Sequence, residues 1–262
     1  MHLEVDHASG ARTQLDYGTK LVGVSQGYWG VSLFPDAAEG VAVFHSANAK
    51  RRSGSGGDPE ESRRVAARRA RTRVRRYCAA NRLNRFATLT YGPPFCWDPR
   101  VLREHVGRFF RRLRGQLGVD ALPYLWTGEL HADGLRWHAH FAVGRYVPRR
   151  KIEIAWPYGF VHIELFGDLP YAASSLDQAR KAAGYLSKYV DKSFGDPGHA
   201  LGPHRYEVAQ GFAPRREGIR GRSSEEVLAW AVERMGRAAD FVQSSAEWHD
   251  YQGPSVVFFS WT

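Results

Sequence analysis

The sequence is poor in cysteine. Its two cysteines, Cys78 and Cys96, form neither a CxxC metal motif nor a disulfide framework, so we expect two buried free thiols in a reducing compartment. Long apolar runs are also missing, and the N-terminus lacks the basic and apolar stretches of a secretion signal. These absences predict a soluble cytoplasmic protein with no membrane partner.

Lysine is scarce as well. Six of the 37 basic residues are lysines, and three of them, Lys181, Lys188 and Lys192, fall within one short segment. The net charge of +10 favours a polyanionic partner such as DNA or RNA. No internal repeat is visible and nothing matches GxxxxGK[ST], so the sequence contains no ATPase or helicase motif.

The chain divides into three parts by composition. Residues 1–62 predict a β-rich extension that ends in a flexible basic linker, residues 63–212 the main domain, and residues 213–262 a helix and a strand.

An arginine-rich run opens the main domain. Small and apolar residues recur at helical spacing between residues 63 and 76, which predicts an amphipathic basic helix. Two interpretations remain open for its charged side: a solvated helix face, or phosphate contacts made by Arg68, Arg71, Arg75 and Arg76.

Regular patterns follow. Alternating residues predict strands at 85–91, 124–131, 137–143 and 160–165, and helical spacing predicts helices from 99 to 117 and from 176 to 192. The order indicates an antiparallel sheet with helices on one face, the α+β class of ferredoxin-like and RRM-like folds, with the opposite face open for chemistry. Weaker signals predict a strand at 205–212, a helix at 224–242 and a strand at 255–261.

A hairpin carries the first candidate site. Asp133-Gly134 flanked by alternating residues is a strong signal for a two-residue turn. Counting outward from this turn places Glu129 opposite His138, and Thr127 opposite His140. Opposed residues share a face of the sheet, and so do residues two apart on one strand.

The face shared by Glu129, His138 and His140 is suited to a divalent metal. Two imidazoles and a carboxylate can bind a cation and leave coordination positions open. An exposed His-x-His pair without a metal is the alternative, and the placement of Glu129 favours the metal site. His131 is either a neighbour of these ligands or a surface residue near the turn.

A helix carries the second candidate site. The unit Tyr-x-x-Lys occurs twice in tandem, at Tyr185 to Lys188 and at Tyr189 to Lys192. Residues four apart lie on one side of a helix, so the two phenols project together, as do the two ammonium groups. Nearby cations or a metal can activate a phenol as a nucleophile. Tyrosines used for packing, with lysines reaching to water, are the alternative.

Three segments together resemble a known family. Residues 86–91, then 138–140, then 185–192 resemble, in that order, the three motifs of HUH endonucleases. The resemblance is closest to rolling-circle replication initiators, the Rep proteins of bacterial plasmids and single-stranded DNA phages, including their two-tyrosine subgroup. It covers residues 63–212.

The resemblance implies a mechanism and partners. A divalent ion, Mg²⁺ or Mn²⁺, would be held by His138, His140 and a third polar ligand, for which Glu129 fits. Tyr185 and Tyr189 would be nucleophiles that leave a 5′-phosphotyrosine link, with Lys188, and then Lys192, as the helping cations. The substrate would be single-stranded DNA at an origin hairpin. A host helicase and the host replisome would be the partners in replication.

Strand 85–91 is expected to add DNA contacts through Thr88, Thr90 and Tyr91. Two rival functions remain. One is an HUH transposase or relaxase, and the other is a non-catalytic RRM-like module in which Phe86, Tyr91 and Trp137 stack on bases.

Overall fold

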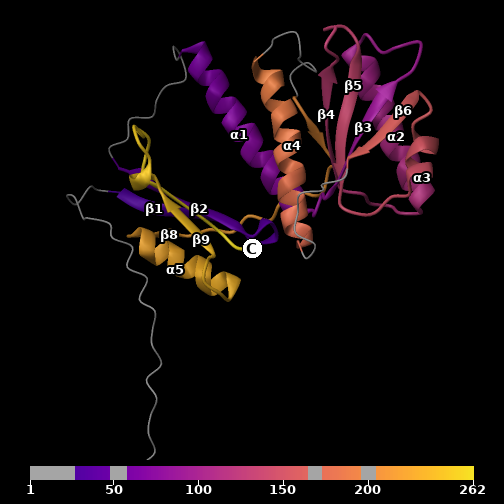
Figure 1. Ribbon diagram of the computed structural model, residues 1–262. Coiled ribbons are helices and arrows are strands. Elements are labelled where there is room, and N and C mark those ends of the chain that lie inside the picture. Colours follow the sequence, from indigo (N-terminus) through magenta and orange to yellow (C-terminus); the bar gives the residue numbers. More distant parts are fainter. Residues whose placement is uncertain (1–26, 48–57, 165–172, 196–204) are drawn as a thin grey trace, which may run out of the picture.

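The computed structural model describes residues 27–47, 58–164, 173–195 and 205–262. Within these ranges the chain forms two antiparallel five-stranded sheets and five α-helices (Figure 1). This arrangement confirms the predicted α+β class and is consistent with a ferredoxin-like or RRM-like fold. Most of the predicted flexible linker, at 48–57, lies outside the described residues.

The first sheet, which we call the site sheet, has the strand order β6-β3-β5-β4-β7. Its strands are β3 (Arg85–Tyr91), β4 (Tyr124–Leu130), β5 (Trp137–Val143), β6 (Gly159–Glu164) and β7 (Glu207–Val208). The first four agree with the predicted strands to within about one residue. The strand predicted at 205–212 is present only as the two residues of β7, which pair with Leu125 and Trp126 of β4.

One face of the site sheet packs against α2 (Pro99–Leu117) and α3 (Arg149–Ala155). Asp98 caps α2, its carboxylate accepting a hydrogen bond from the backbone of Arg100. The sheet contributes large buried rings to this core, among them Trp126, Trp137 and Phe141. The sequence did not predict α3, because its seven residues are too few to establish a helical period.

The opposite face of the site sheet carries α4 (Ser175–Gly195), and α1 (Pro59–Ala80) packs against α4 (Figure 1). Leu186 and Val190 of α4 are fully buried against Val74 of α1 and against Leu125 of the sheet. The sequence predicted both long helices on one face and an open opposite face, whereas α4 lies across the face assigned to chemistry, because its apolar side is buried there.

The second sheet, which we call the flanking sheet, has the strand order β8-β1-β2-β10-β9. Its strands are β1 (Gly27–Phe34), β2 (Glu39–Ser46), β8 (Arg220–Gly221), β9 (Phe241–Ser244) and β10 (Val256–Ser260). Strands from both sides of the main domain thus pair in one sheet. The boundaries after residues 62 and 212 stay predictions.

Helix α5 (Ser224–Met235) covers one face of the flanking sheet (Figure 1). The predicted helix at 224–242 was too long. The helix ends at Gly236, which has a φ of 72° and so adopts the left-handed conformation that glycine favours, and β9 follows. The predicted terminal strand is confirmed as β10.

Glu39 joins the two halves of the molecule. Its side chain is almost fully buried, and its carboxylate accepts hydrogen bonds from Arg76 Nε at 2.5 Å and from Arg75 Nη2 at 3.1 Å. The same two guanidinium groups lie over the rings of Phe34 and Phe258. Arg75 and Arg76 therefore hold α1 to the flanking sheet, and their predicted contacts with DNA stay predictions.

Both cysteines are free and buried, as expected. Burial raises the pKa of each thiol, which keeps Cys78 and Cys96 in the unreactive neutral form. Within the described ranges, we find no helix with the length and apolar character that crossing a membrane would require.

Replacing Glu39 by Gln should destabilise the protein. The change leaves the Arg76 guanidinium, whose side chain is 18% exposed, without its counter-charge. We expect the free energy of unfolding to fall by about 3 kcal/mol, measured by urea denaturation. Glu60→Gln is the matched control, because Glu60 forms an exposed pair with Arg64 and should change stability by less than about 1 kcal/mol. Equal effects of the two changes would contradict the role of Glu39.

Candidate metal centre

The hairpin of β4 and β5 has the predicted register, but its turn is wider than the predicted two residues, because the hydrogen bond that closes it joins His131 N–H to Arg136 O. Asp133 accepts backbone hydrogen bonds from Leu135 and Arg136, and Gly134 has a φ of 70°. Beyond the turn, Glu129 pairs with His138 and Thr127 pairs with His140. The spacing of residues around the Asp-Gly turn therefore sets which side chains meet on the sheet.

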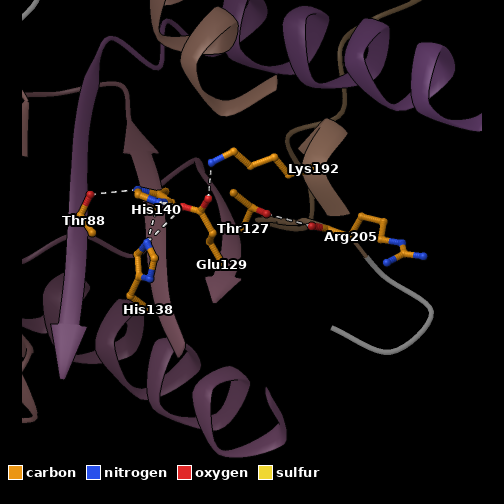
Figure 2. A network of polar contacts seen from close by, with 7 residues as sticks. All are labelled: Thr88, Thr127, Glu129, His138, His140, Lys192 and Arg205. Atoms are coloured by element: carbon orange, nitrogen blue, oxygen red, sulfur yellow. Dashed lines mark hydrogen bonds and ion pairs between the residues drawn. The ribbon is translucent and has the colours of Figure 1, made fainter. Parts of the chain in front are cut away.

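Three side-chain atoms converge on the face that α4 crosses. His138 Nε2 and His140 Nε2 are 3.0 Å apart, and Glu129 Oε2 is 2.9 Å from His140 Nε2 and 3.2 Å from His138 Nε2 (Figure 2). Both histidines are buried, with 8% and 5% of their surface exposed. Glu129, His138 and His140 thus form a compact triangle of potential ligand atoms.

The triangle has the dimensions of a metal site. Ligands at about 2.1 Å from a divalent ion with octahedral geometry are about 3.0 Å from one another along one face. The observed edges of 2.9 to 3.2 Å fit this spacing. One carboxylate and two imidazoles also leave further positions for a substrate oxygen or water. The cluster could therefore hold a metal ion.

Electrostatics keep Glu129 and His140 in the forms that bind a metal. Burial by itself would raise the pKa of Glu129, but hydrogen bonding with His138, His140 and Lys192 outweighs it and holds that pKa well below its ordinary value. Burial, together with the neighbouring His138 and Lys192, lowers the pKa of His140 despite the opposing effect of Glu129. At neutral pH the carboxylate is therefore ionised, and the His140 imidazole is neutral.

Two further side chains orient the ligands. Thr88 Oγ1 of β3 lies 2.9 Å from His140 Nδ1, the ring nitrogen that faces away from the triangle. Lys192 Nζ of α4 donates a hydrogen bond of 2.6 Å to Glu129 Oε1 (Figure 2). Hydrogen bonds to the outer atoms of metal ligands fix their orientation and tautomer. His138 has no such partner in the described residues, because its buried Nδ1 makes no hydrogen bond there.

Of the two tyrosines, Tyr189 lies at the cluster. Its ring stacks on that of His140, with ring centres 3.7 Å apart and planes 15° apart. Tyr185 lies one turn earlier, with its ring centre 6.1 Å from that of Phe86. A different lysine ammonium group lies near each phenol ring. Lys192 Nζ lies 5.5 Å from the centre of the Tyr189 ring, and Lys188 Nζ lies 4.9 Å from that of Tyr185.

The four predicted catalytic residues are therefore close together but not equivalent. The sequence favoured Lys188 as the better-placed cation. The structure places Lys192 on Glu129 and leaves Lys188 beside Tyr185, where it is exposed. Their roles in catalysis stay predictions.

The residues predicted to bind DNA are scattered. Arg68 is exposed on α1, and Arg71 pairs with Asp191 of α4 at 2.8 Å. Thr90 lies between His138 and Phe160 in the sheet register, next to the cluster. Tyr91 is buried on the other face, with its hydroxyl 3.1 Å from His105 Nδ1. DNA binding by these residues stays a prediction.

Burial weakens the non-catalytic alternative. That function needs Phe86, Tyr91 and Trp137 as open stacking platforms, and all three are at most 5% exposed. His131 lies beside the cluster, its ring centre 4.3 Å from that of His138, while its backbone closes the turn with Arg136.

The sequence did not predict the contacts of Thr88 and Lys192 with the ligands. Both depend on pairings between segments far apart in the chain, β3 with β5 and α4 with β4. The alternation of β3 could have placed Thr88 on the polar face only if its pairing with β5 had been known.

The fold and the site define an α+β protein with a candidate metal centre beside a helix that carries two tyrosines. Residues 84–194 match the family of the replication-associated protein ORF2. The matched segment is less than half of the chain but contains the three candidate ligands and both tyrosines. No curated protein and no solved structure matches the chain. The match supports a replication-associated protein, for which DNA is the expected partner.

Thr88→Val should weaken metal binding. Valine keeps the shape of threonine but cannot hydrogen bond with His140 Nδ1, so the imidazole loses the contact that orients it. We expect Mn²⁺ to bind about tenfold more weakly, measured by calorimetry or by the electron paramagnetic resonance of free Mn²⁺. Thr88→Ser retains the hydroxyl and should bind nearly as wild type, whereas Glu129→Gln should abolish binding. Equal affinity of the Val and Ser variants would contradict this role of Thr88.

Proposed function

We propose that this protein is a rolling-circle replication initiator that nicks and rejoins single-stranded DNA through a phosphotyrosine intermediate. The observation that carries the proposal is the stacking of Tyr189 on His140, at a cluster of three potential metal ligands. The match of residues 84–194 to a replication-associated family supports the same function.

The chemistry follows from the groups present. Glu129, His138 and His140 would hold Mg²⁺ or Mn²⁺, which when bound draws charge from the scissile phosphate. The phenol of a tyrosine releases its proton to solvent water, and its oxygen attacks the phosphorus. One O–P bond forms and the bond from phosphorus to the 3′-oxygen breaks. The 3′-oxygen takes up a proton, which leaves a 5′-phosphotyrosine link and a 3′-hydroxyl that can prime synthesis.

Lys192 contributes charge and not proton transfer. Its hydrogen bond with Glu129 raises the pKa of its ammonium group, so it remains protonated at neutral pH and cannot accept the phenolic proton. Beside Tyr189 it stabilises negative charge on the phenolate and on the phosphate. Lys188 is placed to do the same for Tyr185.

The two tyrosines perform different steps because they lie at different distances from the ligand cluster. Tyr189, beside His140, makes the first cut, and Tyr185, one turn away, serves the second transfer that rejoins the strand. The substrate is a single-stranded segment of an origin hairpin. We further propose that a host helicase unwinds the template and that the host replisome extends the 3′-end.

A covalent protein–DNA adduct should form with a labelled single-stranded origin oligonucleotide and Mn²⁺, and should survive denaturing electrophoresis. Tyr189→Phe should reduce the initial rate of adduct formation by at least about a hundredfold, because phenylalanine has no nucleophile. Tyr185→Phe should reduce it far less, and the double variant should form no adduct.

His138→Ala is the control for metal dependence. It should abolish the adduct and change DNA binding only slightly, because phosphate contacts by arginines provide most of that affinity. An adduct that persists in the double tyrosine variant would show that the nucleophile lies elsewhere in the chain.

Initiation can be separated from transposition or relaxation in cells. A plasmid that carries the gene with its own origin should replicate only when Tyr189 is intact, because each round needs the new 3′-end. Plasmid copy number measures this dependence, and Tyr146→Phe, a change of an exposed tyrosine away from the centre, is the matched control. Replication that is independent of Tyr189, in a protein that still forms the adduct, would favour a transposase or relaxase.

A further inference from the structure

The flanking sheet has one face that α5 does not cover. Side chains alternate along its strands, and Val31, Leu33 and Ala42 point to α5 and are buried. The alternate residues therefore point away from α5. They are, in the register of the sheet, Tyr28, Gly30, Ser32, Phe34, Glu39, Val41, Val43, His45, Arg220, Phe241, Gln243, Val256, Phe258 and Ser260.

Helix α1 contacts only one end of this face. Near the C-terminal end of α1, Arg75 and Arg76 form ion pairs with Glu39, and their guanidinium groups lie over the rings of Phe258 and Phe34. From there α1 runs away from β1 and β2 (Figure 1). The other end of the face, where β1 begins and β2 ends, carries Tyr28 and His45.

A stack of three side chains occupies that open end. The Tyr28 ring stacks on the His45 ring, with centres 4.9 Å apart and planes 21° apart, and the Arg220 guanidinium lies 4.7 Å from the centre of the Tyr28 ring. Gly30 makes room for the His45 ring, because a Cβ at this position would lie only 3.1 Å from His45 Nε2. His45 and Arg220 are exposed, and Tyr28 is half-buried.

Two arginines, Arg216 and Arg220, bring positive charge to this face. Among the described strand residues of this face, Glu39 is the one acidic residue, and Arg75 and Arg76 neutralise it. In the described part of the chain no carboxylate forms an ion pair with Arg220. Arg216 lies on the same face, where its guanidinium donates a hydrogen bond of 2.8 Å to Ser32 Oγ. The surface therefore attracts anions through arginine. It also offers the exposed ring of His45, because the two faces of the Tyr28 ring are covered by His45 and Arg220.

We propose that this open face of the flanking sheet is a second binding surface, which holds single-stranded DNA outside the metal centre. The choice of DNA rests on the proposed function. Arginine neutralises the phosphates, and the exposed ring of His45, which Tyr28 supports from beneath, stacks with an unpaired base.

The chemistry selects a single strand over a duplex. Bases in a duplex are stacked on their neighbours, so a flat aromatic surface gains nothing from them, whereas the bases of a single strand leave their faces open. Arginines alone would bind both forms through the phosphates. The contribution of the His45 ring, held in place by Tyr28, is therefore the part of the affinity that separates a single strand from a duplex.

Binding of the full-length protein to fluorescein-labelled oligo(dT), measured by anisotropy in EDTA, tests the surface without cleavage. Tyr28→Leu with Arg220→Gln should weaken binding about tenfold, because the ring that supports His45 and a phosphate contact are both lost. The matched control is Tyr146→Leu with Arg150→Gln, which removes the same two residue types from exposed positions near α3 and should change binding by less than about twofold. Tyr28→Phe retains the ring and should bind as wild type.

The outcomes separate this proposal from the proposed function. The variant with Tyr28→Leu and Arg220→Gln should still form the covalent adduct with a short origin oligonucleotide, because both residues lie outside the metal centre. If no protein forms an adduct, the proposed function fails and the oligo(dT) result still stands. Affinity equal to that of the control double variant, or an equal loss of affinity for a duplex of the same length, would overturn the proposal.

Photocrosslinking of the wild-type protein makes the test independent of any variant's stability. Oligo(dT) that carries 5-iododeoxyuridine should crosslink to Tyr28 or His45, identified by mass spectrometry of the peptides. Crosslinks confined to residues 58–195 would overturn the proposal.

Discussion

The carboxylate of Glu129 connects the two parts on which the candidate site depends. One oxygen meets the imidazoles of His138 and His140, and the other accepts a hydrogen bond from Lys192. A largely buried carboxylate is stable only when its charge is compensated, and here the sheet and α4 share that task. Any shift of α4 would therefore disturb the ligand triangle. The position of Tyr189 against His140 follows from this coupling.

A second buried carboxylate, Glu39, plays a comparable part in the architecture. It forms ion pairs with Arg75 and Arg76 of α1, so the helix that packs against α4 is also bound to the flanking sheet. The C-terminal turns of the arginine-rich helix thus hold the molecule together, whereas Arg68, nearer its N-terminal end, is exposed.

Much of the site could be predicted from the sequence because its geometry is local. The Asp133-Gly134 turn fixes the pairing of Glu129 with His138, and helical spacing places Tyr185 and Tyr189 on one side of α4. Contacts between distant segments could not be predicted in this way. Neither Thr88 on His140 nor Lys192 on Glu129 leaves a signal in spacing, since both require knowledge of which elements pack together.

The sequence by itself determined the α+β class, the hairpin register and the face on which the ligands meet, because turns and alternation act over a few residues. Tertiary structure alone decided that strands from both flanks form one sheet and that α4 brings Tyr189 to the ligands. It also decided that Arg75 and Arg76 meet a buried carboxylate. Such long-range contacts depend on the packing of whole elements, where the burial of apolar surface outweighs any local preference.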